Sequence, residues 1–426
     1  MKIAIISNIF SPHVRGGYEL GCQKIASHLQ DIGHHVEVLT SCAIGQLAKK
    51  DRSCDLIVRE IFEPIFEYEV MPDVERSNNW QARRRQSLGG FLPTNMRSLS
   101  NYVLESNPDV FWVFNPLGLG PIGIFETLVA HRQRIVVHLM DNIDGVIADH
   151  QGSINLLPRL IRLKGKISAI SCSRKIKDAN EKHGTYKTHQ IIYNGFDFES
   201  NASLIKSEPN KDGVIRFVYF GQVERIKGLS QCAKALAALR RRRPDYQFEW
   251  HIVGPGSRAF QDEFRLLIKE LGIESQVSFH GMMSQEALFL LASKMDVALM
   301  LLSDAEPFAY SPLEASSLGL PVMITSGAGV NECFPNPYPL MVKNRDNVSE
   351  VVGRLLWCRE HREALGKLAI SLKDSLKQFC DLYSCTVPAY LDVVNSLTAD
   401  YQPGDLQSAL STAHYLVLLD SAFPTR

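Results

Sequence analysis

The sequence lacks several features that would place it in other classes of protein. Its nine cysteines form no C-x-x-C pair, and no stretch of about 18 apolar residues could span a bilayer. Scattered cysteines are typical of reduced thiols, so a disulfide framework or a zinc site is not expected. The apolar start is soon broken at Pro12 and has no signal-peptide cleavage site. We therefore expect a cytoplasmic protein.

Net charge is also missing, because 46 Lys and Arg residues balance 46 Asp and Glu residues. A neutral chain has no bulk attraction for DNA, so nucleic acid is not an expected partner. The sequence contains no D-x-D triplet. We accordingly predict chemistry that needs neither a metal ion nor a cofactor.

What the sequence does contain is a repeated alternation of strand and helix patterns. The strand candidate Lys2–Ser7 is followed by a loop, a helical pattern ending near Gly33, and a second strand candidate at 35–40. This order is typical of a parallel α/β sheet. Further strand candidates are Val110–Phe114, Arg134–Leu139, Ile167–Ser171, Ile191–Tyr193, Ile215–Phe220, Phe248–Val253, Val277–His280, Val297–Leu301 and Val322–Ile324.

The alternation predicts two Rossmann-like doubly wound α/β domains, at residues 1–199 and 214–375. A polar stretch at 200–213 lacks apolar periodicity and is interpreted as the linker. Residues 60–100 are predicted to form a long loop or insertion, and the tail at 399–426 has no assigned structure. Such an arrangement predicts a cleft, with ligands at the carboxyl ends of the strands.

Two glycine-containing loops are candidate phosphate sites. Gly16 and Gly17 follow the first strand, where glycine amides and a helix N-terminus favour an anion, although a plain turn explains them equally well. The segment from Gly221 to Gly228 places Arg225 and Lys227 at another helix start. Cations there oppose the helix dipole, so an anionic ligand would balance them; the alternative is a solvated loop.

A third segment carries the glutamates Glu306 and Glu314 on either side of a predicted helix start near Ser311. A carboxylate one turn into a helix can accept two vicinal ribose hydroxyls, and free amides at the helix start would face a phosphate. The alternative is that both carboxylates simply complement the helix dipole.

Together these segments resemble glycosyltransferase family 4, the retaining enzymes of the GT-B fold. The glutamates match the E-x7-E motif of that family, and the Gly221–Gly228 loop resembles its strand–GR–KG segment. Other matching segments, in the same order, are Gly16-Gly17, Asn194-Gly195-Phe196-Asp197, His251–Gly256, Gly319–Val322 and Gly327–Glu332.

The resemblance implies a function and a set of site residues. The chain would move a sugar from a nucleotide-diphosphate sugar, its co-substrate, to a glycan or glycolipid acceptor, as in surface polysaccharide or glycolipid synthesis. Residues 376–398 would form a helix that returns to the first domain, which would bind the acceptor. Glu306 and Asp141 would be catalytic, without a metal. The implied donor-binding residues are Gly16, Gly17, Gly221, Arg225, Lys227, Gly254, Phe308, Ala309, Leu313 and Glu314.

Three positions depart from the family pattern. Gln222 stands where many members have Arg, Ala309 replaces a frequent Gly, and Met140 takes the place of a His before Asp141. His138, two residues earlier, is interpreted as a core histidine. These departures keep a non-catalytic sugar-nucleotide-binding protein open as an alternative, beside a nucleotide-sugar epimerase.

Membrane contact is a weaker prediction. Residues 157–166 place Arg159, Arg162, Lys164 and Lys166 among apolar residues, a pattern that could lie on an anionic bilayer at the inner face of the membrane. An ordinary surface helix is the favoured interpretation. The four arginines at 240–243 are interpreted as structural, because they lie at a helix C-terminus.

Overall fold

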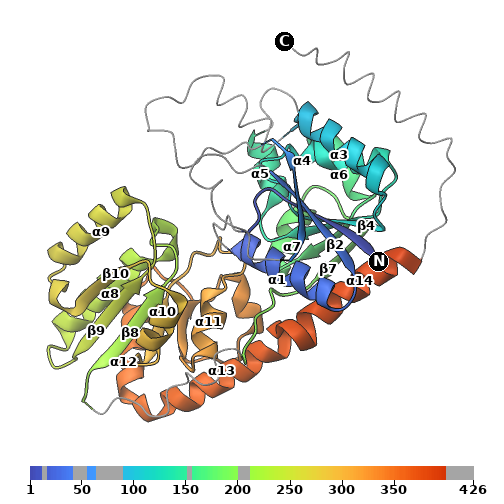
Figure 1. Cartoon of the computed structure of the whole chain (residues 1–426). Helices are drawn as coiled ribbons and strands as arrows, with labels where there is room; N and C mark the ends of the chain where they lie inside the picture. The colour runs from blue at the N-terminus through green and yellow to red at the C-terminus, as the bar shows by residue number, and fades with distance from the viewer. Residues whose placement is uncertain (12–16, 42–54, 64–89, 151–155, 200–211, 400–426) are drawn as a thin grey trace. The chain divides into compact units, whose positions relative to one another are not determined.

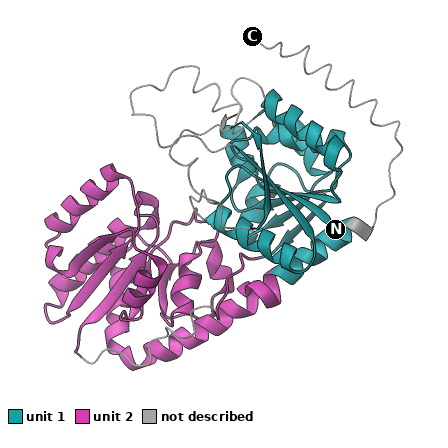
Figure 2. Cartoon of the chain, in the orientation of Figure 1, with its two compact units in different colours: residues 1–192, 387–426 teal, residues 193–386 magenta. Residues whose placement is uncertain are grey.

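The computed structural model of the chain describes residues 1–11, 17–41, 55–63, 90–150, 156–199 and 212–399 (Figure 1). The chain divides into two compact units (Figure 2). Unit 1 comprises Met1–Ile192 together with Val387–Arg426, and unit 2 comprises Tyr193–Thr386. Each unit is a parallel sheet with helices, so the predicted fold of two Rossmann-like α/β domains is confirmed.

Within its described residues, unit 1 holds a seven-stranded parallel sheet in the order β3-β2-β1-β4-β5-β6-β7. The strands are β1 (Lys2–Ser7), β2 (His35–Ser41), β3 (Ile57–Phe62), β4 (Val110–Asn115), β5 (Ile135–Leu139), β6 (Ser168–Ser171) and β7 (Thr188–Ile191). All residues of β4 and β5 are buried, as expected for strands covered on both faces. The helices are α1 (Gly17–Asp31), α3 (Pro93–Ser106), α4 (Pro121–Ala130), α5 (Ile143–His150), α6 (Leu157–Lys164), α7 (Arg174–Glu181) and α14 (Val387–Ala399).

Unit 2 holds a six-stranded parallel sheet, again within the described residues, in the order β10-β9-β8-β11-β12-β13. The strands are β8 (Ile215–Phe220), β9 (Phe248–Val253), β10 (Val277–Gly281), β11 (Val297–Met300), β12 (Val322–Thr325) and β13 (Met341–Val342). The longer helices are α8 (Leu229–Arg242), α9 (Arg258–Glu270), α10 (Gln285–Ala292), α11 (Ser311–Ser317), α12 (Val348–Glu360) and α13 (Leu365–Cys380). The strand order reverses beside β8, so the loops after β8 and β11 come out at the switch point where ligands bind in such sheets.

The boundary between the units differs from the predicted one. It falls at Ile192 and Tyr193, because Tyr193 already stacks on Phe308 and the Phe196 amide donates to the Cys380 carbonyl at 2.8 Å. Most of the predicted linker, residues 200–211, lies outside the described residues. Residues up to 386 belong to unit 2, and only the chain from Val387 belongs to unit 1, where the Tyr390 ring meets the Trp112 ring at 5.0 Å.

The prediction of a long loop at 60–100 is wrong at both ends of that segment. β3 runs to Phe62 and α3 begins at Pro93. β3 is an edge strand with only Phe62 buried, so its sequence lacks the apolar run or strict alternation that reveals a strand. Residues 64–89 and the tail from 400 lie outside the described residues.

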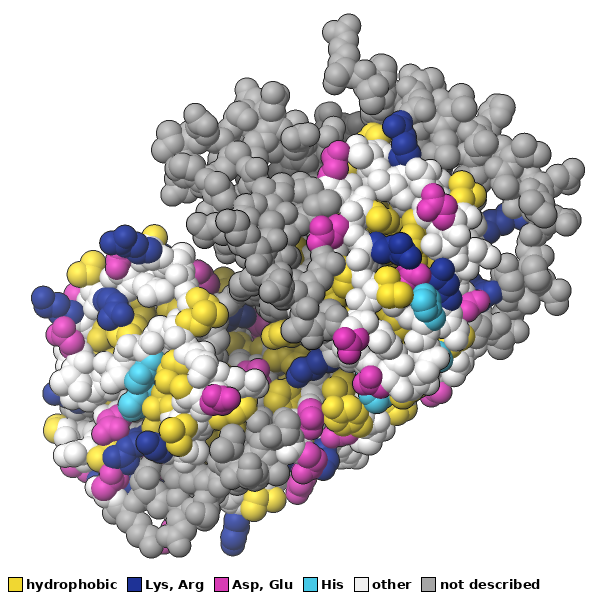
Figure 3. All heavy atoms as spheres, in the orientation of Figure 1, with side chains coloured by type: hydrophobic (Ala, Val, Ile, Leu, Met, Phe, Trp, Pro, Cys, Tyr) yellow, Lys and Arg dark blue, Asp and Glu magenta, His cyan; other side chains and the backbone are white. Residues whose placement is uncertain are grey.

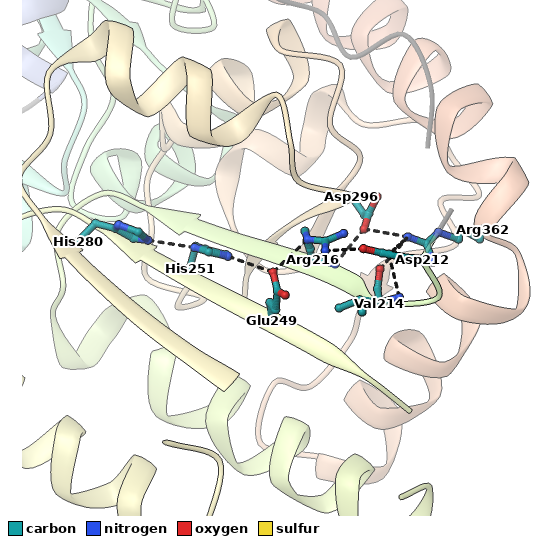
Figure 4. A network of polar contacts seen from close by, with 8 residues as sticks. All are labelled: Asp212, Val214, Arg216, Glu249, His251, His280, Asp296 and Arg362. Atoms are coloured by element: carbon teal, nitrogen blue, oxygen red, sulfur yellow. Dashed lines mark hydrogen bonds and ion pairs between the residues drawn. The ribbon is translucent and has the colours of Figure 1, made fainter. Parts of the chain in front are cut away.

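A polar network ties together the amino-terminal ends of the unit 2 strands (Figure 4). Arg216 of β8 bonds Glu249 of β9 at 3.0 Å, and its amide donates to Asp296 at 2.9 Å, just before β11. Arg362 also reaches Asp296 at 3.4 Å. The His251 and His280 rings extend the network along β9 and β10, with Nδ1 of His251 3.0 Å from Nε2 of His280. The Arg216, Glu249 and Asp296 contacts fix the amino-terminal ends of β8, β9 and β11, whereas the two histidines lie nearer the carboxyl ends of β9 and β10.

Candidate functional site

The centre of the candidate site in unit 2 is an ion pair between Lys227 and Glu306. Lys227 lies in the short 3₁₀ turn (Arg225–Lys227) after β8, and Glu306 lies in the loop after β11. The Lys227 Nζ atom is 2.6 Å from Glu306 Oε2, and the side chains are 17% and 11% exposed. Residues that are 79 positions apart in sequence thus meet at the carboxyl edge of the sheet.

Close backbone packing fixes the two loops that carry this ion pair. Gly228, with φ of 78°, lies so near β11 that an added Cβ would be 1.8 Å from the Leu301 carbonyl oxygen. The Gly329 amide donates to the Glu306 carbonyl at 3.1 Å. Tyr219 donates its hydroxyl to the Gln222 carbonyl at 2.6 Å, which holds the start of the first loop. Only glycine fits at position 228, since a side chain would meet both strain and collision.

Gly221 and Gly254 serve the same packing. Both have φ of 135°, and an added Cβ on Gly254 would lie 1.8 Å from the Gly221 carbonyl oxygen. The Gly254 amide donates to Gly281 at 2.8 Å, which links the ends of β9 and β10. Contact of these two glycines with a nucleotide-sugar donor stays a prediction. In the structure, each of them joins the ends of neighbouring strands.

Phe308 and Ala309 continue the loop after Glu306. Phe308 is buried, and its carbonyl accepts a hydrogen bond from the buried Asn194 side chain at 3.4 Å. The Tyr193 ring stacks on Phe308 with centroids 5.7 Å apart, and its hydroxyl donates to Glu332 at 3.2 Å. The sequence places Asn194 in a turn but does not reveal its contact with Phe308, because the two residues lie more than a hundred positions apart.

Glu314 lies half-buried in the first turn of α11, which begins at Ser311 as predicted. The amides of Leu313 and Glu314 both donate to the Tyr310 carbonyl, at 2.9 and 3.0 Å. The Leu313 amide is therefore engaged within the helix start, and a phosphate contact by this group stays a prediction. Ala309 is half-buried in the same loop.

Arg225 does not join Lys227 at Glu306. Its guanidinium forms two hydrogen bonds with Glu263 of α9, one of them at 2.8 Å, and lies over the Phe260 ring. The Arg225 side chain is 69% exposed. The two cations predicted to bind phosphate therefore have different partners in this structure. Arg225 pairs with Glu263, and Lys227 pairs with Glu306.

In unit 1, the predicted residues lie at the carboxyl ends of β1 and β5. Gly17 is the first residue of α1, whereas Gly16 lies outside the described residues. Asp141 is half-buried just after β5, and Met140 before it is buried. The Met140 amide donates to the Tyr18 hydroxyl at 3.1 Å, so α1 and the end of β5 are joined at this point.

His138 is a core residue, as interpreted from the sequence. It is 1% exposed, neither ring nitrogen has a hydrogen-bond partner, and its ring stacks on Phe114 with centroids 4.2 Å apart. Burial lowers its pKa from 6.5 to about 3, so the imidazole is neutral. A neutral ring packed among aromatic side chains has no route to a substrate.

The structure corrects the predicted charge pattern of residues 157–166. Lys164 is fully buried and pairs with Asp144, while Arg159 pairs with Glu126 at 2.8 Å. Arg162 and Lys166 remain exposed, which weakens the case for a cationic membrane face. No helix among the described residues is long and apolar enough to cross a membrane. Acidic and basic side chains are interspersed over the described surface seen in Figure 3.

The described part of the chain contains no cluster of three or more His, Cys, Asp or Glu side chains placed to hold a metal ion. Two of the arginines at the end of α8 make structural contacts. Arg240 donates to Gln276 at 3.0 Å, and Arg243 donates to Asp245 at 3.0 Å.

The chain is similar in sequence and in fold to several known proteins. Residues 201–371 match the family model of the glycosyl transferases group 1. An uncharacterized glycosyltransferase of Methanocaldococcus jannaschii is 24% identical over 84% of this chain and 89% of its own. A D-inositol 3-phosphate glycosyltransferase of Pseudarthrobacter chlorophenolicus is 24% identical over 78% of this chain and 81% of its own. The crystal structure of Anabaena HepE in complex with UDP is similar with a TM-score of 0.68 and 20% identity, over 93% of this chain and 100% of that one. The chain therefore has the GT-B fold, and its segment 201–371 is similar to the glycosyl transferases group 1.

Proposed function

We propose that the chain is a retaining glycosyltransferase that moves a sugar from a nucleotide-diphosphate sugar to a glycan or glycolipid acceptor. The observation that carries the proposal is the Lys227–Glu306 ion pair, 2.6 Å long, inside the matched domain and at the carboxyl edge of its sheet. A lysine beside a glutamate at this edge offers one group for a phosphate and one for sugar hydroxyls. The geometry supports the donor side of the reaction most directly.

In this proposal Lys227 stabilises the negative charge that develops on the nucleotide diphosphate as the sugar leaves. A fixed ammonium group lowers the energy of that charge without needing to reorganise during the reaction. Glu306 then contacts the transferred sugar, and Glu314 accepts the ribose hydroxyls. Donor binding exchanges the Lys227–Glu306 contact for contacts with phosphate and sugar, so the pair keeps both side chains in place while the site is empty.

Unit 1 provides the acceptor side in this proposal, with Asp141 after β5 as the group that contacts the acceptor hydroxyl. A carboxylate can orient a hydroxyl group or accept its proton, and its distance from that hydroxyl in a complex would decide between the two roles. Arg225 is a secondary donor contact. It would have to exchange Glu263 for a phosphate, which costs little because both side chains are exposed.

The decisive experiment incubates the purified chain with nucleotide sugars and a panel of glycan and glycolipid acceptors. Sugar on an acceptor with the anomeric configuration of the donor supports the proposal. An epimerised nucleotide sugar would instead identify an epimerase. Binding with neither product would identify a non-catalytic binding protein.

The donor is chosen first by thermal shift, because a ligand that binds only the native state raises the melting temperature. UDP is tested before GDP and ADP, since HepE was crystallised with UDP. Transfer activity is also measured with EDTA. We expect no loss, and a full loss that Mg²⁺ or Mn²⁺ restores would overturn the metal-independent mechanism.

A further inference from the structure

A connected set of polar contacts in unit 1 surrounds the turn that carries Asp141. On one side is Tyr18, in the first turn of α1 and next to Gly17. Its hydroxyl accepts the Met140 amide at 3.1 Å and interacts electrostatically with the Asp141 carboxylate. Because the hydroxyl oxygen accepts that amide, the one phenol proton is available to the carboxylate. Burial, and next the charge of Asp141, raise the pKa of Tyr18, so the phenol stays protonated and continues to donate.

On the other side is Asn180, a buried residue of α7. Its Nδ2 group donates to the Asp141 carbonyl at 2.9 Å, and its Oδ1 accepts the Asp144 amide at 3.2 Å. One side chain therefore fixes both ends of the turn between β5 and α5. Tyr18 holds the amide just before Asp141 and Asn180 holds its carbonyl, so the backbone of Asp141 is fixed on both sides with the Tyr18 hydroxyl beside the carboxylate.

Behind Asn180 lies the buried ion pair of Lys164 and Asp144. The Lys164 Nζ atom bonds Asp144, donates to the Asn180 carbonyl at 2.5 Å, and lies 5.0 Å from the centre of the Tyr186 ring. The two side chains are 0% and 1% exposed. Burial raises the pKa of Asp144 and lowers that of Lys164, and the charge of each partner offsets part of that shift in the other. This pair anchors Asn180 and the start of α5.

A second tyrosine in the same unit makes nearly the same contacts at the opposite end of the sheet. Tyr102 of α3 donates to the Glu37 carboxylate at 3.1 Å, and its ring meets Phe111 edge-on, at 6.2 Å and 82°. Tyr18 meets Phe114 edge-on at 6.3 Å and 80°. Glu37 lies near the start of β2, whereas Asp141 follows the end of β5. Glu37 differs in that it also pairs with Arg59 and His35, and it lies away from the edge where ligands bind.

We infer that Tyr18 is a positioning residue that orients the Asp141 carboxylate toward the acceptor and ties it to the start of α1. This inference rests on the proposed function, because it requires that Asp141 contact the acceptor. Tyr18 itself touches no substrate; it acts by fixing where the carboxylate points. Asn180 supports the same turn through the backbone, so its contribution to stability is larger and its effect on orientation is less specific.

The test compares Tyr18→Phe with Tyr102→Phe, which removes a tyrosine hydroxyl bonded to a carboxylate at the other end of the sheet. For Tyr18→Phe we expect kcat to fall about 10- to 100-fold, because a misaligned carboxylate stabilises the transition state less well. The KM of the nucleotide-sugar donor should stay within about twofold of the wild-type value. For Tyr102→Phe we expect kcat within about twofold of wild type. Thermal unfolding of both variants is measured in parallel, and similar losses of stability are expected.

A double-mutant cycle with Asp141→Asn decides whether Tyr18 acts through Asp141. If it does, Tyr18→Phe costs little further activity once the carboxylate is gone, so the two effects are clearly less than additive. Fully additive effects, or equal losses of kcat in the two tyrosine variants, would overturn the inference. The proposed function fails separately, if the wild-type chain transfers no sugar from any donor that it binds.

Discussion

The carboxyl edges of the two sheets are built by different means. In unit 2, glycines at strand ends pack against carbonyl oxygens, as Gly228 does against Leu301, and the Lys227–Glu306 ion pair lies on this frame. In unit 1, side chains hold the corresponding turn: Tyr18 and Asn180 around Asp141, with Lys164 behind them. Backbone packing fixes a loop at the cost of allowing only glycine, whereas side-chain packing depends on several partners at once. The first is robust to most surface changes, and the second is sensitive to the loss of any one polar group.

The largest effect is expected for Gly228→Ala, which tests the backbone frame of unit 2. The new Cβ would lie 1.8 Å from the Leu301 carbonyl oxygen, at a φ of 78° that disfavours side chains. We expect unfolding free energy to fall by about 5 kcal/mol, measured by urea denaturation. The control is Gly353→Ala in α12, where nothing lies within 4 Å of the added atom. Equal stability of the two variants would refute the packing argument.

Lys164→Met tests the side-chain frame of unit 1. It leaves Asp144 buried without its partner, so we expect a loss of about 4 kcal/mol in unfolding free energy, again by urea denaturation. Arg162→Met is the matched control, because Arg162 is exposed on the same helix and should change stability by less than about 0.5 kcal/mol. A small effect of Lys164→Met would mean that the ion pair adds nothing to this frame.

Lys227→Ala tests the charge placed on the unit 2 frame. We expect the dissociation constant of the nucleotide diphosphate to rise roughly 100-fold, because a charge-assisted contact with phosphate is lost, as measured by isothermal titration calorimetry. Arg225→Ala should have a smaller effect, of about fivefold, since Arg225 is exposed and already paired with Glu263. Wild-type affinity in Lys227→Ala would remove Lys227 from the donor site.

The smallest effect is expected for His138→Phe, which changes the core of unit 1 beneath its polar turn. The folded-state pKa of about 3 lies below the unfolded value of 6.5, so the unfolded chain takes up a proton first as pH falls. Stability is therefore lost below about pH 6.5, by about 1.4 kcal/mol for each pH unit down to about pH 3.

The variant removes this one titration. The unfolding free energy, measured by denaturation at pH 7.5 and at pH 5.5, should therefore fall between the two pH values by about 1.4 kcal/mol less in the variant than in wild type. Activity at neutral pH should be unchanged. A strong loss of activity there would contradict the assignment of His138 to the core.

Much of the fold was predictable because its signals are local. Apolar runs such as Val110–Phe114 become fully buried strands, and Ser173 caps α7 by accepting the Ile176 amide at 3.3 Å. β3 was not predictable, because an edge strand exposed to solvent carries little apolar pattern. The unit boundary was misplaced for a related reason: the contacts of Tyr193 and Phe196 with unit 2 involve residues far along the chain.

The candidate site divides in the same way. The spacing of Glu306 and Glu314 and the glycines of the first loop were visible as motifs, and the structure puts Lys227 at Glu306. Motifs did not reveal that Arg225 pairs with Glu263 instead. They also did not reveal that Tyr193 and Asn194 both contact Phe308. Nothing local distinguishes an arginine that faces a helix from one that faces a phosphate.

By itself, therefore, the sequence determined the two parallel sheets, the loops that end their strands and the residue types that those loops present. Only the tertiary structure decided which side chains meet. Lys164 is the clearest case. Its position in a cationic, amphipathic segment predicts a surface residue, whereas in the fold it is the buried partner of Asp144. The reason is physical, since periodicity and turn chemistry act over a few residues, whereas burial and charge pairing depend on segments that approach only when the sheet is assembled.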